Sequence, residues 1–124
     1  MSPVSDAHFE QARQNRAFAE QMLTDYGNSP THVQWAVTAA YYSALHCRQG
    51  YLLIRGRDPQ SHVARGHEIA DPANQVPMDV QRAYIRLEQF SKKARYRLGI
   101  FAPSFVRSRI FDDTLKRVTD FVGL

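Results

Sequence analysis

Apolar residues recur at three- and four-residue steps along most of this chain, which is the spacing that places side chains on one face of an α-helix. The first such series predicts a helix over residues 5–26, ended by Gly27 and Asn28. Its apolar positions are Phe9, Ala12, Ala19, Met22, Leu23 and Tyr26. Arg16 falls on the same line of positions, so we expect its guanidinium to need partners if it is buried.

A second, longer helix is predicted to begin after Ser29, because serine is a favoured N-cap and Pro30 suits the first helical position. Its apolar residues cover more than half of its circumference, as is typical of a central helix that is packed on several sides. They are Val33, Ala36, Val37, Ala40, Tyr41, Ala44, Leu45, Tyr51, Leu52 and Ile54. His46 and Arg48 interrupt this pattern, and we expect both on the exposed face, since charged side chains are rarely buried unpaired.

The remaining pattern predicts a long loop and two more helices. Gly56, Pro59, Gly66, Pro72 and Pro77 leave room for only one short helical turn near residues 61–69. Helical spacing resumes over residues 80–98, and a last helix is predicted from an N-cap at residue 104 to about residue 122. With no alternating strand, the chain is predicted to be one all-α domain over residues 1–124, an antiparallel four- to five-helix bundle.

Composition adds a preference for anionic partners. The formal net charge is +4, from 16 Lys and Arg against 12 Asp and Glu, and this excess favours association with a polyanion. The single cysteine, Cys47, lies in an apolar run and is expected to pack rather than react. We find neither the pattern of a signal peptide nor an apolar run long enough to cross a membrane. A cytoplasmic protein without membrane association is therefore expected.

The loop after the second helix concentrates cations and imidazoles. Arg55, Arg57, His62, Arg65 and His67 fall within thirteen positions. This combination suits RNA cleavage by the 2′-hydroxyl, in which an imidazole moves the proton and a guanidinium holds the phosphate. The structural alternative is that Ser61 caps a short helix, with His62 half-exposed and the arginines forming a solvated rim.

A second basic cluster, residues 92–97, lies at the end of the third predicted helix. Arg95 could contact phosphate there, and Tyr96 could stack on a base. The alternative is a solvated helix end, where cations are favoured by the helix dipole, with Tyr96 packed into the bundle. Motifs for zinc binding, phosphate-binding loops and serine hydrolases are absent, and no metal or other cofactor is expected.

The run AVTAAYYSALHCRQGYLL, the following Ser-His and the later SKKARY resemble the HEPN superfamily of small helical proteins, over roughly residues 29–98. The resemblance implies a four- or five-helix domain, commonly a homodimer, in toxin–antitoxin, anti-phage or RNA-processing settings. Active members carry an Arg-x4-6-His motif that supports metal-independent RNA cleavage at a dimer interface. Arg57 and His62 match that motif and are the implied catalytic pair, with Arg55, Arg65, His67, Arg95 and Tyr96 binding RNA or a nucleotide.

Three interpretations remain open at this point. The chain is a metal-independent endoribonuclease, or a non-catalytic module that binds RNA, a nucleotide or a partner protein from a two-gene system, such as a nucleotidyltransferase. The third interpretation is a helical dimer whose charges only keep it soluble. For any dimer, an aromatic residue such as Trp35 or Tyr42 is the first expected contact, because aromatic residues are enriched at interfaces.

Overall fold

The computed structural model describes residues 3–124, and every regular element in that range is helical. The elements are α1 (Pro3–Tyr26), α2 (Pro30–Ile54), α3 (His62–Ala70), the 3-10 turn η1 (Pro72–Asn74), α4 (Met78–Tyr96), α5 (Pro103–Phe105), the π-helix η2 (Val106–Leu115) and α6 (Lys116–Phe121). The predicted all-α class is thus confirmed. No helix among these residues is long and apolar enough to cross a membrane.

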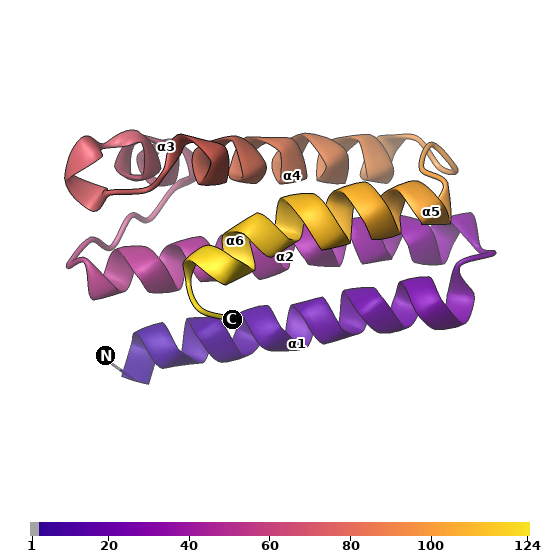
Figure 1. Ribbon diagram of the computed structural model, residues 1–124, viewed down its shortest axis with the longest axis horizontal. Coiled ribbons are helices and arrows are strands. Elements are labelled where there is room, and N and C mark those ends of the chain that lie inside the picture. Colours follow the sequence, from indigo (N-terminus) through magenta and orange to yellow (C-terminus); the bar gives the residue numbers. More distant parts are fainter. Residues whose placement is uncertain (1–2) are drawn as a thin grey trace.

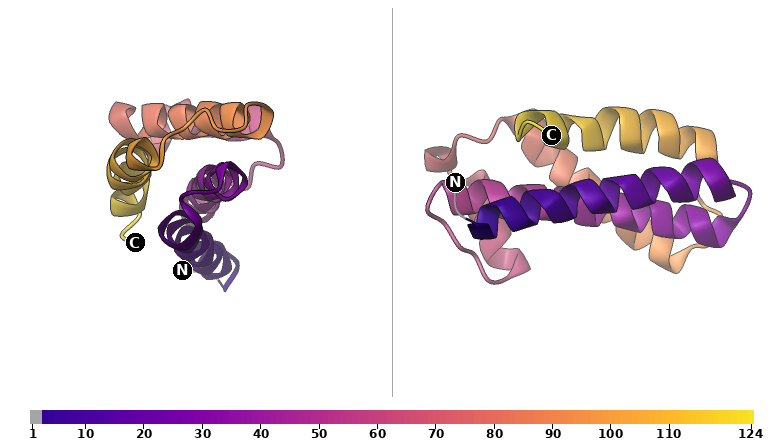
Figure 2. Two further views of the ribbon diagram at one scale, coloured as in Figure 1. Left: turned by 90° about the vertical axis from the view of Figure 1, so that its right-hand side faces the viewer. Right: turned by 90° about the horizontal axis from the view of Figure 1, so that it is seen from below.

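The long segments run antiparallel to one another in chain order (Figure 1). Seen end-on, α2 lies between α1 and α4, and the final segment of α5, η2 and α6 returns beside α2 and α4 (Figure 2). The interface between α1 and α2 is the most extensive in the molecule, and α2 also contacts α3, α4, η2 and α6. The prediction that the second helix is central is therefore confirmed.

Small residues on α2 allow its neighbours to approach closely. Ala36, Ala40 and Ala44 are fully buried, and Gly50 faces the ring of Phe9 so closely that a Cβ atom there would lie 2.9 Å from it. Close packing of this kind fixes the position of α1 along α2, because interiors packed to crystal density leave little room for adjustment.

Local sequence signals fix two of the helix starts. The side chain of Ser29 accepts a hydrogen bond from the backbone N–H of His32, so this N-cap is as predicted. The side chain of Ser61 accepts one from the backbone N–H of Ala64, which is the cap described in the structural alternative for the loop. The predicted N-cap at Ser104 is wrong. The N-cap position is Ala102 and the last segment begins at Pro103, two residues earlier than predicted, because proline is favoured in the first turn of a helix, where its missing N–H has no intrahelical partner.

Two arginines that interrupt apolar patterns have different environments. Arg16 is half-buried, and its Nη1 donates a hydrogen bond to the backbone oxygen of Leu124 at 3.3 Å. The prediction of an exposed Arg48 is wrong, because only 6% of the residue is exposed. Its neighbour Cys47 is buried as predicted, and burial raises the pKa of the thiol to about 12.

Candidate functional site

The predicted catalytic arginine already has a partner within the protein. Arg57 Nε lies 3.6 Å from a carboxylate oxygen of Glu68 on α3, and both side chains are partly exposed. Arg55 donates a hydrogen bond to the backbone oxygen of Ala73 at 2.5 Å, which ties the end of α2 to the turn η1. These two arginines therefore stabilise the loop, and a ligand would have to compete for them.

Arg65 is also engaged, through a glutamine on α2. Its Nε donates to Gln49 Oε1 at 3.1 Å, and Gln49 Nε2 donates to Asp58 Oδ1 at the same distance. Gln49 is buried, so this chain of bonds fixes α3 against α2. The role of Arg65 in the structure is accordingly to dock the short helix.

His62 and His67 stand on different sides of the α3 surface. His62 is the first residue of α3, directly after the capping Ser61, and its side chain is exposed. It lines a cleft between α2, α3 and α4, whereas His67 is exposed outside that cleft. Of the seven residues predicted for the site, His62 alone lines this cleft.

The cleft has a volume of about 140 Å³ and combines polar with apolar side chains. The lining residues are Arg48, His62, Gly66, Ile69, Ala70, Gln81, Tyr84, Ile85 and Glu88. Three separate helices contribute, so the cleft exists only in the folded chain.

Arg48 lies at the inner wall of this cleft and lacks hydrogen-bond partners for two of its nitrogens. Nε and Nη2 are both buried and unpaired. Its guanidinium lies over the ring of Tyr84, with Cζ 5.4 Å from the ring centroid. Nε and Nη2 form one edge of the planar guanidinium, and such an edge matches two oxygens of a phosphate or carboxylate.

Electrostatics at the cleft favour an incoming negative charge. Burial lowers the pKa of Arg48 below its ordinary value, yet an arginine stays protonated in proteins, so a positive charge is held in a poorly solvated place. Burial likewise raises the pKa of Tyr41 and of Tyr84, and both hydroxyls remain neutral donors. Glu88, which also lines the cleft, forms an ion pair with Lys92 at 3.0 Å, and its charge partly offsets the effect of burial on the pKa of Arg48.

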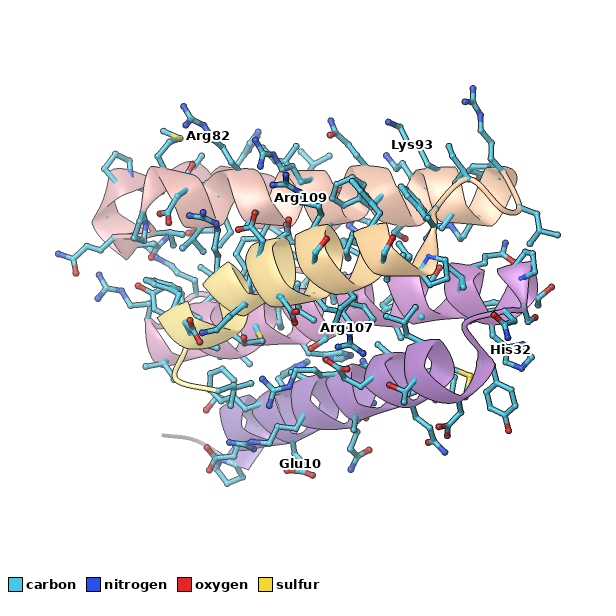
Figure 3. All side chains as sticks on the ribbon, turned by 45° about the vertical axis from the view of Figure 1, so that its right-hand side comes forward. Glu10, His32, Arg82, Lys93, Arg107 and Arg109 are labelled. Atoms are coloured by element: carbon cyan, nitrogen blue, oxygen red, sulfur yellow. The ribbon has the colours of Figure 1, made fainter. Side chains whose placement is uncertain are left out.

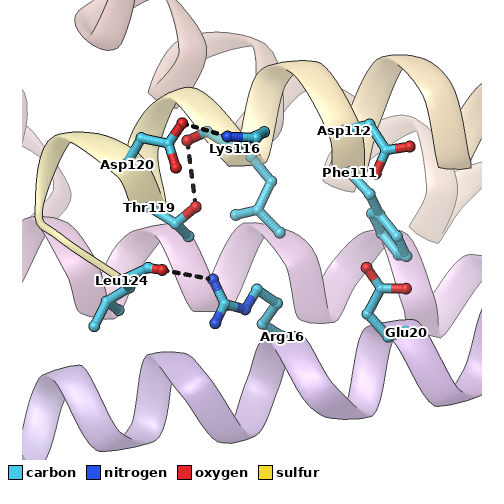
Figure 4. A pocket seen from close by; sticks show the side chains of 9 residues that line it. Arg16, Glu20, Phe111, Asp112, Lys116, Thr119, Asp120 and Leu124 are labelled. Carbon is cyan, nitrogen blue, oxygen red and sulfur yellow. Dashed lines mark hydrogen bonds and ion pairs between the residues drawn. The ribbon is translucent and has the colours of Figure 1, made fainter.

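The hollow that lies against α1 offers less chemistry. The hollow between α1 and the final segment, about 370 Å³, is shown in Figure 4. Its charged groups are mostly paired within the protein: Arg16 with Leu124, Lys116 with Asp120, and Glu20 with Arg107. No group of three or more side chains suited to a metal ion occurs among residues 3–124.

Arg95 and Tyr96 lie at the far end of α4. Arg95 Nη1 donates to Ser91 Oγ at 2.7 Å. Tyr96 is 82% exposed, so the alternative in which it packs into the bundle is wrong. At 1.5 Å per helical residue, Tyr96 is about 12 Å along the axis from Glu88, and these residues do not share the cleft with His62.

Arg48 is the site residue that sequence reasoning missed. Tyr41, Ala44, Arg48 and Leu52 follow one another at three- and four-residue steps, and the other three are buried. That spacing was the available signal, because it places Arg48 on a buried face of the helix. Comparison with known proteins adds no further assignment, since no family model, no curated protein and no solved structure matches this chain.

Proposed function

We propose that this protein binds a phosphate-bearing ligand, an RNA or a nucleotide, in the cleft between α2, α3 and α4. The observation that supports this is the buried edge of Arg48, with two N–H groups that no protein atom satisfies. An unsatisfied buried donor costs about 1–3 kcal/mol. A bound phosphate would remove that cost with two charge-assisted hydrogen bonds once the side chain turns toward the cleft.

The first experiment measures binding of ATP and of a fluorescent single-stranded RNA to the wild-type protein, Arg48→Met and Arg57→Met. Arg57→Met is the matched control, because it removes the same charge from a surface ion pair outside the cleft. We expect Arg48→Met to abolish ATP binding and Arg57→Met to retain it. Equal affinities in all three proteins would refute the proposal.

A second candidate function is metal-independent RNA cleavage, which the presence of His62 in the same cleft favours. The His62 imidazole would accept the proton of the 2′-hydroxyl as that oxygen attacks the adjacent phosphorus. The 5′-oxygen of the next nucleotide would leave and take up a proton from water, giving a 2′,3′-cyclic phosphate and a 5′-hydroxyl end. Arg48 would compensate for the charge that develops on the phosphate oxygens, the role that the sequence motif gave to Arg57.

Cleavage is tested by incubating cellular RNA with the protein in EDTA, beside His62→Ala, Arg48→Met and Arg57→Ala. Fragments ending in 2′,3′-cyclic phosphate that disappear with His62→Ala and Arg48→Met would support the assignment. Loss of cleavage in Arg57→Ala alone would favour the residues of the HEPN-like motif instead. Binding without any cleavage would support the non-catalytic interpretation.

We also propose that the protein forms a homodimer through the aromatic face, defined here as Phe18, Trp35 and Tyr42. These side chains are 46%, 53% and 45% exposed and line one hollow between α1 and α2. None of the residues that line the hollow is an Asp, Glu, Lys or Arg. Two copies of a protein with net charge +4 could therefore associate through this face without bringing like charges into contact.

Light scattering after gel filtration tests the dimer. We expect Trp35→Glu to convert a dimer to a monomer, because the new charges would be desolvated at the interface. Met78→Glu is the control, since Met78 is similarly exposed, at 57%, but lies on α4 away from this face. A wild-type monomer at high concentration, or a dimer that Trp35→Glu leaves intact, would refute the assignment.

A further inference from the structure

A second concave surface on α4 carries positive charge that the proposed cleft does not use. The groove between α4 and the final segment has a volume of about 200 Å³. Its lining residues are Asp79, Arg82, Ala83, Arg86, Thr114 and Arg117. Three guanidinium groups thus surround a hollow that contains a single carboxylate.

The carboxylate is already neutralised by one of the arginines. Arg117 Nη1 lies 3.3 Å from an oxygen of Asp79, and Arg117 Nε donates to Asp113 at 2.8 Å. Arg82 and Arg86 are exposed and make no hydrogen bond or ion pair to any residue in the range 3–124. Both charges are therefore available to a partner.

Further unpaired cations continue the groove along its length. Lys93 lies on the same side of α4 as Arg82 and Arg86, because the positions are separated by four and seven residues. In Figure 3, Arg82 and Lys93 project from α4 away from the bundle, and Arg109 reaches from η2 toward α4. Together these residues make a row of cations rather than a point site.

The wall opposite α4 has an unusual backbone. η2 is a π-helix of ten residues, and within it the hydroxyl of Thr114 donates to the backbone oxygen of Arg109, five positions earlier, at 2.7 Å. π-helical turns are rare and are found frequently at functional sites. Thr114 lines the groove, so the irregular backbone is part of this surface.

We infer that this groove binds the phosphate backbone of a single-stranded RNA. A row of exposed, unpaired cations fits a chain of phosphates better than it fits a single phosphate. Tyr96, near Lys93 at the end of α4, is 82% exposed and offers an aromatic surface on which an unpaired base can stack. The inference extends the proposed function, since it makes the ligand a polynucleotide, but it depends on different residues.

The experiment compares binding of a labelled 20-nucleotide RNA and of ATP across a salt series. The groove variant is Arg82→Gln/Arg86→Gln. Its control is Arg13→Gln/Lys116→Gln, which removes the same charge from residues that pair with Glu10 and Asp120 outside the groove. Lys116 precedes Arg117 in sequence but lines the hollow against α1 instead.

We expect the groove variant to lower the slope of log K against log salt by about 1.4, since each phosphate contact to a single strand contributes about 0.7. Relative to 1 M salt, this corresponds at 0.1 M salt to a loss of RNA affinity of about 25-fold. The control variant should keep the wild-type slope, and ATP affinity should not change in either protein. Circular dichroism melting of both variants verifies that they are folded.

The possible outcomes separate this inference from the proposed cleft. If the groove variant and its control bind RNA equally well, the groove assignment is wrong, whatever Arg48→Met does. If the groove variant weakens RNA binding while Arg48→Met leaves the affinities for RNA and ATP unchanged, the groove assignment is supported and the cleft assignment is wrong. An acidic peptide or double-stranded DNA that binds the groove more tightly than the RNA would overturn the choice of ligand.

Discussion

Replacing Arg48 by methionine should make this protein more stable. Arg48 is 6% exposed, and its Nε and Nη2 have no hydrogen-bond partner. Methionine is also long and unbranched but brings neither charge nor unsatisfied donors, and a flexible thioether adapts to irregular space. The substitution therefore removes an electrostatic cost while it keeps most of the packing.

The size of the effect follows from three contributions. Two unsatisfied buried donors cost about 1–3 kcal/mol each. Against this, the contact of the guanidinium with the Tyr84 ring, at 5.4 Å, is lost, and a desolvated cation–π contact contributes about 2 kcal/mol. These contributions leave an expected net gain of about 0–4 kcal/mol, which overlaps the range found when buried ionic groups are replaced by apolar ones. For a domain of this size, the melting temperature should rise by about 4 °C for each kcal/mol.

Thermal and urea unfolding of the wild type, Arg48→Met and Arg16→Met measure this effect. Arg16 is the control because it is half-buried like a typical amphipathic arginine and donates a hydrogen bond to Leu124. We expect Arg16→Met to be neutral or destabilising. A loss of more than 1 kcal/mol in Arg48→Met, in contrast to the gain expected for removing unsatisfied donors, would show that Arg48 stabilises the bundle and would remove the basis of the cleft.

Two further predictions concern residues of α2, and the first has a control on α3. Gly50→Ala should destabilise by about 1 kcal/mol, because an overpacking cost of about 1–3 kcal/mol against the buried Phe9 ring exceeds the helix-propensity gain of about 1 kcal/mol; Gly66→Ala, which meets open space, should instead stabilise, and urea midpoints check both. Burial and neighbouring His8 lower the pKa of His46 below 6.5, so the folded state prefers the neutral imidazole, whose Nδ1 lies 2.9 Å from that of His8. The stability that the neutral His46 contributes is complete above pH 6.5 and is lost as the pH falls toward the lower pKa of the folded state. We therefore expect the urea midpoint to change less between pH 7.5 and 5 in His46→Gln than in the wild type. An equal change of the midpoint in both proteins would contradict the reasoning.

The helices could be predicted from sequence because their signals are local. The caps at Ser29 and Ser61 depend on residues three positions away, and the apolar faces depend on spacing within one helix. The prediction at Ser104 is wrong because two local signals compete there: serine favours the N-cap position, and the preceding Pro103 favours the first turn of the helix, where the structure places it. The π-helical turns of η2 have no recognised sequence signal in this chain, since its apolar spacing fits an ordinary helix equally well.

The candidate site was less predictable because it depends on packing between distant segments. Arg57 and His62 are close in sequence, yet Arg57 pairs with Glu68 whereas His62 lines a cleft with Arg48. Arg48 becomes buried only when α3 and α4 pack over α2. Which cations of the groove are unpaired likewise depends on contacts between distant segments. Arg117, for example, pairs with Asp79, which lies 38 residues away in the sequence.

The cleft and the groove should differ in how salt affects them, because their cations differ in exposure. Arg48 is buried, and interactions inside a protein are screened weakly by dissolved ions. Arg82 and Arg86 are exposed, and contacts of exposed cations with a polyanion weaken steeply as salt rises. A mononucleotide held by the cleft should therefore keep most of its affinity at a salt concentration that releases a strand from the groove. The affinity of an RNA that contacts both surfaces should fall with rising salt only until it reaches the affinity that Arg48 provides. The plateau of the salt titration therefore measures the contribution of the cleft to binding, and the slope measures the contribution of the groove.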